Sequence, residues 1–454
     1  MSRRITTRAQ VSGYRFGLAR AEHALVRRDA RMVHDPMRSQ ARALVAGGVV
    51  AVLILAGAGV YGLIRPAPTV GDARIVAESG GGLFVLVDGV MHPVLNLASA
   101  RLVVGGPAPV KSVSARSLRE YPRGPTLGIA GAPGSLPGPA ADGESRWTVC
   151  DGPDGTAVVA GSLSVAPSPR GAGAVVSHDG GVWLLFDDGS VPVRARLDTS
   201  RVEVVRALGL ENAGVRPVSA ALLDSFPERP ALTVPEIAGR GTPGPLGLLV
   251  GSVVRTAAVD GSAAYRVVLR DGVQQIPATA ADMLRAADRT GASAVREIAP
   301  GELTSVRHVT RLALDQFPES APRIVDATVL CRNWSRGRDE RSARETMLSS
   351  EVLPVSSTPV RLASADGPGP AVDLVFLPPG TAEHVAVTGA PPDSALAGQR
   401  FVIADTGVRY RLAGEDAGPS LGLGDDPPRM PWSILSRLPE GPELSRAAAL
   451  TARD

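Results

Sequence analysis

The sequence predicts an α+β membrane protein, in which a basic cytoplasmic helix and one transmembrane helix precede a large extracytoplasmic body of short strands and helices. Three observations carry this prediction. Residues 43–64 contain no charged side chain, and four similar hairpin-like segments recur after them. The 454 residues also include 51 glycines and 39 prolines, a composition that favours many short elements joined by turns over long helices.

The uncharged segment, residues 43–64, is long enough to cross a membrane. A helix of this length reaches roughly 33 Å, enough for the hydrocarbon core of a bilayer. Ten arginines lie ahead of it, opposed by only three acidic residues, whereas Arg65 alone follows closely. The positive-inside rule therefore predicts a single-pass protein of the inner (plasma) membrane, with residues 1–42 in the cytoplasm and the remainder outside. The alternative is a cleaved signal peptide, but its apolar region would be shorter.

Residues 12–34 are predicted to form an amphipathic cytoplasmic helix, with Ser12 as its N-cap and Asp35-Pro36 as its stop. One face is apolar, with residues recurring at spacings of three, four and seven, namely Tyr14, Leu18, Ala21, Leu25 and Met32. The opposite face carries Arg15, Arg20, Arg27, Arg28 and Arg31. We expect this helix to lie on anionic lipid or to dock on an acidic partner. The alternative is that the arginines only set the membrane orientation.

The two cysteines, Cys150 and Cys331, both follow the span. In an oxidising compartment, two cysteines are most simply one disulfide. Such a bond would close a loop of roughly 180 residues, which loop-closure arguments value at up to about 4 to 5 kcal/mol. The alternative is two separate buried thiols.

Four apolar runs that each meet a tight-turn dipeptide indicate a repeat. Asp88-Gly89, Asp188-Gly189 and Asp271-Gly272 are favoured hairpin turns, and Thr406-Gly407 is a weaker version. The predicted hairpins cover Leu83–Val94, Val182–Val193, Tyr265–Ala278 and Arg400–Leu412.

A short amphipathic helix is predicted after each hairpin, and a proline stops it. The four segments are Ser114–Pro125, Ser219–Pro230, Val309–Pro322 and Trp432–Leu444. One such copy cannot bury its apolar face alone. We therefore expect the four copies to pack on each other or on the sequence between them.

The sequence between the repeats has a pattern of its own. Trp147 stands three residues before Cys150, and Trp334 stands three residues after Cys331. We interpret these segments as two halves of a β-rich central domain, joined by the disulfide. The predicted domains are residues 1–42 (cytoplasmic helix), 43–64 (span), 65–130 (repeat 1), 131–176 (central domain, first part), 177–236 (repeat 2), 237–324 (repeat 3), 325–394 (central domain, second part) and 395–454 (repeat 4 and tail).

No motif for catalysis, metal binding or a cofactor rises above chance. GxSxG, HExxH and CxxC are absent, and the only lysine, Lys111, lacks the preceding glycine of a P-loop. The six histidines have no ligand spacing, and the paired acids Asp187-Asp188 and Asp425-Asp426 are interpreted as solvated turn residues. The net charge of +3 is concentrated before the span, which argues against nucleic-acid binding.

Segments on both sides of the span match those of a known family. They are Gln10–Phe16, Glu22–Asp29, His92–Val104, Gly128–Pro133 and Trp147–Cys150. In combination with the single span, they resemble EccB, a membrane-core component of type VII (ESX) secretion systems in mycobacteria and other actinobacteria. The resemblance covers nearly the whole chain and is least sharp in the fourth repeat.

The resemblance implies a structural and assembly subunit whose four extracytoplasmic repeats surround a central domain in quasi-two-fold symmetry. Its partners would be EccC, EccD, EccE and other EccB copies, in a membrane complex that exports WXG100-type proteins. Some family members are credited with ATP hydrolysis, whereas no P-loop motif occurs in this sequence. The alternatives are a membrane-anchored hydrolase acting on nucleotides or on the cell wall, and a module that binds the cell wall.

Overall fold

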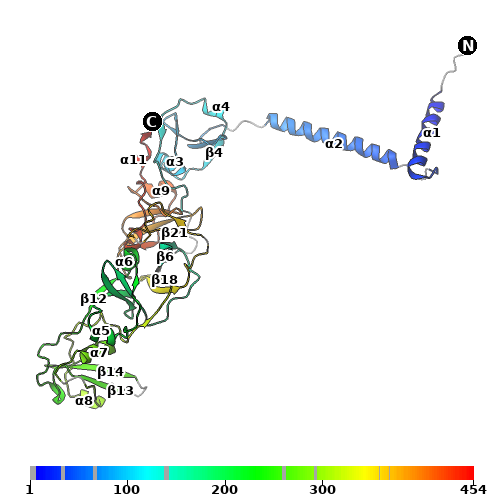
Figure 1. Ribbon diagram of the computed structural model, residues 1–454. Coiled ribbons are helices and arrows are strands. Elements are labelled where there is room, and N and C mark those ends of the chain that lie inside the picture. The colour runs from blue at the N-terminus through cyan, green and yellow to red at the C-terminus, as the bar shows by residue number, and fades with distance from the viewer. Residues whose placement is uncertain are drawn as a thin grey trace, which may run out of the picture. The chain divides into compact units, whose positions relative to one another are not determined.

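A computed structural model describes residues 7–31, 36–64, 69–137, 143–257, 262–290, 294–356, 358–367 and 369–453 of the protein. Contacts divide the chain into two compact units. We call Met1–Thr69 the N-terminal unit and Val70–Asp454 the folded body. Figure 1 labels several elements of each unit.

The N-terminal unit begins with helix α1 (Arg8–Arg27). Gln10 Oε1 accepts a hydrogen bond from the Thr7 backbone N–H at 3.0 Å, and Thr7 is the N-cap. The predicted N-cap, Ser12, therefore lies inside the helix. A side chain that satisfies a backbone N–H can start a helix earlier than the apolar periodicity does.

Helix α1 also ends before the predicted residue 34. Arg28 adopts a left-handed conformation with a φ of 55°, and its backbone N–H donates to the Ala24 carbonyl, which closes the helix. Arg28 and Arg31, which we predicted on the helix face, therefore lie beyond it. Met32 and Asp35 lie outside the described residues.

The second helix, α2 (Pro36–Ile64), contains the predicted span of residues 43–64. The apolar window runs over Gln40–Tyr61, 22 residues, and is the one candidate membrane span among the described residues. Pro36, predicted as part of a helix stop, instead begins α2, a position that proline tolerates because no helical hydrogen bond needs its missing N–H.

A six-stranded central sheet with the order β19-β18-β6-β7-β21-β20 joins distant parts of the folded body. Its hairpins β6–β7 and β18–β19 meet along β6 and β18, which run antiparallel. The strands are β6 (Glu144–Gly152), β7 (Gly155–Ala160), β18 (Val329–Gly337), β19 (Arg344–Ser350), β20 (Val360–Arg361) and β21 (Leu374–Phe376).

Four further sheets each contain a three-stranded antiparallel meander with a parallel strand beside its first strand. The first sheet contains β1 (Ile75–Glu78), β2 (Leu83–Val87), β3 (Val90–Pro93) and β4 (Val110–Val113). The second contains β8 (Ala172–His178), β9 (Gly181–Asp187), β10 (Pro192–Leu197), β11 (Arg216–Pro217), β12 (Glu228–Leu232) and β17 (Arg323–Ile324). The third contains β13 (Val253–Ala257), β14 (Ala263–Leu269), β15 (Gly272–Ile276) and β16 (Arg296–Glu297). The fourth contains β22 (Ala382–Thr388), β23 (Arg400–Ala404), β24 (Arg409–Arg411) and β25 (Arg429–Pro431).

Short helices connect and cover these sheets. They are α3 (Leu97–Val104), α4 (Ala115–Leu118), α5 (Val202–Ala207), α6 (Ala220–Ser225), α7 (Ala278–Ala286), α8 (Pro300–Leu303), α9 (Ala417–Leu421), α10 (Trp432–Leu435), α11 (Arg446–Ala449) and the 3₁₀ turn Pro245–Gly247. The last strand, β26 (Ala452–Arg453), pairs with β5 (Thr126–Leu127) beside the first sheet.

The four predicted hairpins are β2–β3, β9–β10, β14–β15 and β23–β24. Asp88 and Gly89 form the first turn, both with positive φ, as Asp-Gly does in a two-residue hairpin turn. In the third hairpin, Leu269 pairs with Gly272, so the turn is Arg270-Asp271 rather than Asp271-Gly272.

The predicted helix in Val309–Pro322 is wrong, whereas the other three predicted segments contain α4, α6 and α10. The first residues of the segment Val309–Pro322 are extended, because the Val309 N–H donates to the Val273 carbonyl at 3.0 Å. Gln274 Oε1 then accepts from the backbone N–H groups of Arg311 and Leu312, at 2.7 and 2.8 Å. A buried glutamine therefore satisfies backbone groups that a helix would have used.

Two strands begin inside segments that we predicted to be central. Strand β8 begins within residues 131–176 but pairs with β9 of the second sheet, and β22 lies within residues 325–394 but pairs with β23 of the fourth sheet. Buried apolar clusters join the sheets in the same way. One cluster combines Val85 of the first sheet with Val402 of the fourth, and another combines Leu184 of the second with Val267 of the third.

A buried carboxylate closes the turn between β6 and β7. Asp373, fully buried, accepts hydrogen bonds from the backbone N–H groups of Thr156 at 2.8 Å and Gly367 at 2.7 Å. A Cβ at Gly155, which has a φ of 109°, would lie 2.2 Å from Asp373 Oδ2. The turn therefore requires glycine, both for its backbone conformation and for this close approach.

We expect Asp373→Ala to lower the free energy of unfolding by about 1 to 3 kcal/mol, because it leaves a buried backbone N–H without an acceptor. Thermal unfolding of the detergent-solubilised chain measures this loss. Asp366→Ala is the matched control, since the exposed Asp366 accepts a long hydrogen bond, from the Ala371 N–H at 3.3 Å. Equal losses from the two variants would contradict this role of Asp373.

Candidate functional site

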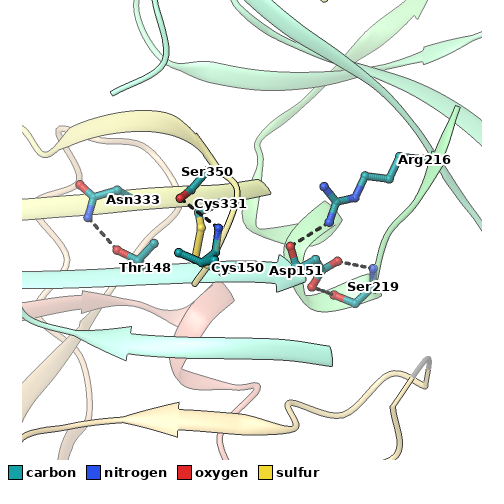
Figure 2. Close-up of a disulfide and its surroundings, with 9 residues drawn as sticks. Thr148, Cys150, Asp151, Arg216, Ser219, Cys331, Asn333 and Ser350 are labelled. Atoms are coloured by element: carbon teal, nitrogen blue, oxygen red, sulfur yellow. Dashed lines mark hydrogen bonds between the residues drawn. A yellow bond between two sulfur atoms is a disulfide. The ribbon is translucent and has the colours of Figure 1, made fainter. Parts of the chain in front are cut away.

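Cys150 of β6 and Cys331 of β18 lie at the junction between the two halves of the central sheet. They stand directly opposite each other in the antiparallel register, with Cα atoms 4.0 Å apart, and form a disulfide. Both residues are fully buried, and Figure 2 shows the bond crossing between the strands. Because thiol–disulfide exchange needs access to a sulfur atom, burial protects this bond while the fold persists.

The two tryptophans lie on the same seam. Trp147 and Trp334 are cross-strand partners, with 1% and 2% of their surface exposed. Between them and the disulfide, Asn333 Nδ2 donates to Thr148 Oγ1 at 2.8 Å (Figure 2). Direct cross-strand pairs of this kind stabilise an antiparallel sheet. The Trp and Cys spacings noted in the sequence therefore correspond to one antiparallel contact, in which β6 pairs with β18.

Asp151, next to the disulfide, connects the central sheet to helix α6. Its carboxylate accepts from the Ser219 N–H at 2.6 Å and from Ser219 Oγ at 2.9 Å, and Ser219 Oγ caps α6 by accepting from the Leu222 N–H (Figure 2). Arg216 Nη2 donates to the Asp151 carbonyl at 2.9 Å. Burial raises the pKa of the Asp151 carboxyl, and the hydrogen bonds from Ser219 oppose this rise.

A buried ion pair joins the next two strands. Arg332 of β18 pairs with Glu345 of β19, and only 2% and 1% of their side chains are exposed. The Arg332 guanidinium also lies 5.7 Å from the ring centroid of Phe226, the residue that follows α6. Burial raises the pKa of the Glu345 carboxyl, and the charge of Arg332 opposes this rise. The loss of hydration by both charges offsets much of the attraction within such a pair.

This arrangement holds segments of the folded body together. The part of the chain that the structure describes contains no group of three or more His, Cys, Asp or Glu able to hold a metal ion. Lys111 Nζ donates to the Val70 carbonyl at 3.3 Å, within the folded body.

Asp188, predicted as a solvated turn residue, is instead largely buried. Only 6% of its side chain is exposed, and Arg229 Nη2 lies 2.5 Å from its Oδ2. Burial alone would raise the pKa of this carboxyl, but hydrogen bonds from the Val191 N–H and from Arg229 outweigh burial and lower it. The sequence identified Asp188 as a turn former, but no local pattern indicated that Arg229 of β12 would bind its carboxylate.

The apolar face predicted on the cytoplasmic helix is uncovered in the N-terminal unit. Tyr14, Leu18 and Leu25 expose 74%, 59% and 84% of their surface, and no residue of α1 is buried. An uncovered face of large apolar residues on a basic helix is typical of a surface that binds a partner or a membrane.

The predicted arginines divide between α1 and the turn after it. Arg15, Arg20 and Arg27 lie on the helix, whereas Arg28 and Arg31 follow it, so the structure does not bring all five onto one face. Arg20 Nε donates to the Ala30 carbonyl at 3.1 Å, which folds the turn back along the helix. The positive charge of α1 therefore continues into the turn that follows it.

His384 of β22 is a buried titratable residue that sequence reasoning did not single out. It is 9% exposed, and its Nε2 atom has no hydrogen-bond partner among the described residues. Burial, aided by the charge of Arg400, lowers the pKa of the imidazole to about 4. Its only sequence signal is the alternating pattern of β22, which does not distinguish a buried histidine from an exposed one.

Comparison with known proteins gives consistent matches along the chain. Residues 3–454 match the family model described as "Type VII secretion system ESX-1, transport TM domain B". The ESX-3 secretion system ATPase EccB3 of Mycolicibacterium smegmatis is 36% identical, over 100% of this chain and 92% of its own length. The ESX-1 secretion system ATPase EccB1 of Mycobacterium tuberculosis is 35% identical, over 100% of this chain and 96% of its own length.

Solved structures extend the similarity to three dimensions. A chain in an intact ESX-5 inner membrane complex matches with a TM-score of 0.73 and 32% identity, covering 100% of this chain and 97% of that one. A chain of the EccB3 dimer from the ESX-3 core complex also gives a TM-score of 0.73, with 34% identity over 84% of this chain and 100% of that one.

We expect replacement of both cysteines by serine to lower the thermal midpoint of the folded body, with a loss of up to about 4 to 5 kcal/mol for so long a loop. Differential scanning fluorimetry of the detergent-solubilised chain, with and without reducing agent, measures this change. The reductant should lower the midpoint of the wild type and leave the double serine variant unchanged. A double serine variant that unfolds at the wild-type midpoint would exclude a stabilising disulfide.

Acidification should destabilise the protein through His384. Its pKa is about 6.5 when unfolded and about 4 when folded, so the unfolded chain binds more protons between these values and stability falls as the pH drops through them. The loss attributable to this residue is at most about 3 kcal/mol. Urea unfolding at pH 7 and pH 4.5 should show a smaller difference for His384→Leu than for the wild type. An identical pH dependence would contradict the low pKa.

Proposed function

The chain belongs to the EccB family of type VII secretion proteins, and on that premise we propose that it is a structural and assembly subunit of an ESX inner-membrane secretion complex. The observation that carries this proposal is the likeness of the entire chain to one chain of an intact ESX-5 inner membrane complex. The buried seam around Cys150 and Cys331 supports it, because its groups hold the two halves of the body together and none is presented to a substrate.

We infer a single-pass topology with the folded body outside the inner membrane. Helix α2 supplies the span over Gln40–Tyr61, and ten arginines precede it while Arg65 alone follows closely. This asymmetry favours a cytoplasmic α1. A chain of the periplasmic assembly from the ESX-5 inner membrane complex is 32% identical and matches 86% of this chain, which supports an extracytoplasmic body.

We also propose that the four outer sheets are copies of one repeat, related in pairs by a quasi-two-fold axis through the central sheet. Hairpin β6–β7 would correspond to β18–β19, and α6 to α10, which pack against each other. Two ion pairs occupy equivalent places in the second and fourth sheets, namely Arg194 with Glu228 and Arg409 with Glu440. The proposed domains keep the boundaries given above, except that sheet membership assigns β8 to repeat 2 and β22 to repeat 4.

The proposed partners are EccC, EccD, EccE and further EccB copies. One of the matching solved structures is an EccB3 dimer, and the self-association that we propose here follows that relative. We assign docking of the other membrane subunits to α1, since its apolar face is uncovered and arginines surround its end.

The two named relatives carry the word ATPase in their names. We do not extend that activity to this chain. Phosphate binding by a P-loop needs a lysine after glycine, and the single lysine follows Val110 and donates to the Val70 carbonyl.

The test of the proposed function is gentle solubilisation of membranes, followed by purification through a C-terminal tag, native electrophoresis and mass spectrometry. We expect a species much larger than the 46.7 kDa monomer, containing the other Ecc membrane proteins. A lone monomer or dimer without those proteins would overturn the proposal and return attention to wall-binding and hydrolase functions.

We predict that replacing Arg27, Arg28 and Arg31 with alanine lowers the recovery of partner subunits about fivefold or more, since each arginine contributes a charge to the docking surface. Membrane insertion should persist, because Arg38 and Arg42 still precede the span. The matched control replaces three exposed arginines of the folded body, Arg116, Arg119 and Arg196. An equal loss in both triple variants would contradict a specific role for the end of α1. Undiminished partner recovery, with reduced binding to anionic vesicles, would assign these arginines to lipid instead.

A further inference from the structure

The second and fourth sheets differ at one edge, although their strands correspond. Strand β11 leads into α6 as β25 leads into α10, so Pro217 and Arg429, each three residues before its helix, are equivalent. Their partners, Ser177 on β8 and Ala386 on β22, are therefore equivalent as well. The registers of the meanders agree, because Gly173 pairs with Phe186 as Ala382 pairs with Ala404.

In the second sheet, two strands pair with this edge of β8, namely β11 and β17. Beyond the residues of β8 that pair with β11, strand β17 adds in parallel along Ala172 and Gly173. The Arg323 N–H donates to the Gly171 carbonyl at 2.7 Å, and the Val325 N–H donates to the Gly173 carbonyl at 2.9 Å. An extended segment from a remote part of the chain thus completes the sheet through its backbone.

Among the residues that the structure describes, no strand occupies the equivalent position in the fourth sheet. Strand β25 pairs only with Ala386–Thr388, and the ladders of the described residues place nothing against the first half of β22 on this side. The Ala386 N–H points to this edge, since it donates to the Pro428 carbonyl at 3.0 Å. Because backbone groups alternate along a strand, the N–H and C=O groups of Ala382 and His384 point to the same edge.

The unused edge opens into a groove of about 740 Å³. Thr381 to His384 form one wall, and the loop from Gly422 to Pro428 forms the other. The buried His384 Nε2 atom has no partner among the described residues. Glu383, Asp425 and Asp426 contribute three carboxylates to the lining against one arginine, Arg338, so the groove is negatively charged overall.

We propose that this edge of β22 is a docking site for an extended basic segment of a partner protein, which adds as a parallel strand in the way that β17 adds to β8. Strand addition provides backbone hydrogen bonds, and alternate side chains provide specificity. The carboxylates favour a segment with an arginine or lysine beside β-branched residues, the pattern of Pro322-Arg323-Ile324-Val325. The identity of the partner as a secretion subunit rests on the proposed function, whereas the strand edge does not.

The test uses the full chain in detergent and a fluorescent peptide with the sequence of residues 320–327. Fluorescence anisotropy should show binding to the wild type and a loss of about tenfold or more with a peptide N-methylated at its Arg323 and Val325 positions, which lacks the two donors. Ala382→Pro should weaken binding similarly. Proline removes the N–H of residue 382, which points to the edge of β22 that is not paired with β23. Ala382→Ser keeps that N–H and is the matched control. Asp425→Asn combined with Asp426→Asn should weaken binding about fivefold.

Hydrogen exchange separates the remaining outcomes. The Ala382 and His384 amides should exchange rapidly in the free chain and become protected when the peptide binds. Protection in the free chain, whether by its own residues or by a second copy, would overturn the proposal. So would peptide binding that Ala382→Pro and N-methylation leave unchanged, and so would no binding at millimolar peptide. None of these failures would affect the proposed assembly role, which the native purification tests separately.

Discussion

The antiparallel contact between β6 and β18 is the constraint on which the rest of the folded body depends. These strands are 181 residues apart in sequence at the disulfide, and each begins one half of the central sheet. The other long-range contacts follow from their register. Asp224, at the end of α6, binds Arg194 of the second sheet at 2.6 Å and Arg437, just after α10, at 2.5 Å. The two helices can share that carboxylate only when β6 and β18 are correctly aligned.

The chemistry along this contact serves position rather than turnover. The disulfide, the tryptophan pair and the Asp151–Ser219 hydrogen bonds are all buried, and each joins segments that a hinge would separate. Arg336 also joins separate segments, because its guanidinium donates hydrogen bonds to the carbonyls of Glu340, Arg341 and Ser394. A body held at so many internal points suits a subunit that must keep its surfaces in fixed relation within a larger assembly.

Much of this architecture could be predicted from local sequence, and the exceptions have a common cause. Apolar alternation with Asp-Gly turns identified the hairpins, and an uncharged stretch of 22 residues identified the membrane helix. The helix expected after Val309 failed because a distant glutamine, Gln274, binds its backbone. Asp188 and His384 were missed for the same reason, since burial and partners such as Arg229 come from tertiary contacts that no local pattern records.

The sequence separation of β6 and β18 also sets the delay between the synthesis of the two strands. At about 5 to 20 residues per second, synthesis of the 181 residues between Cys150 and Cys331 lasts roughly 10 to 35 s. Throughout that interval the emerging chain carries β6 as an open edge with an unpaired thiol, a combination that invites mispairing with other strands and other cysteines. Closure of the central sheet therefore waits for β18, and the disulfide can form only after that strand has been made.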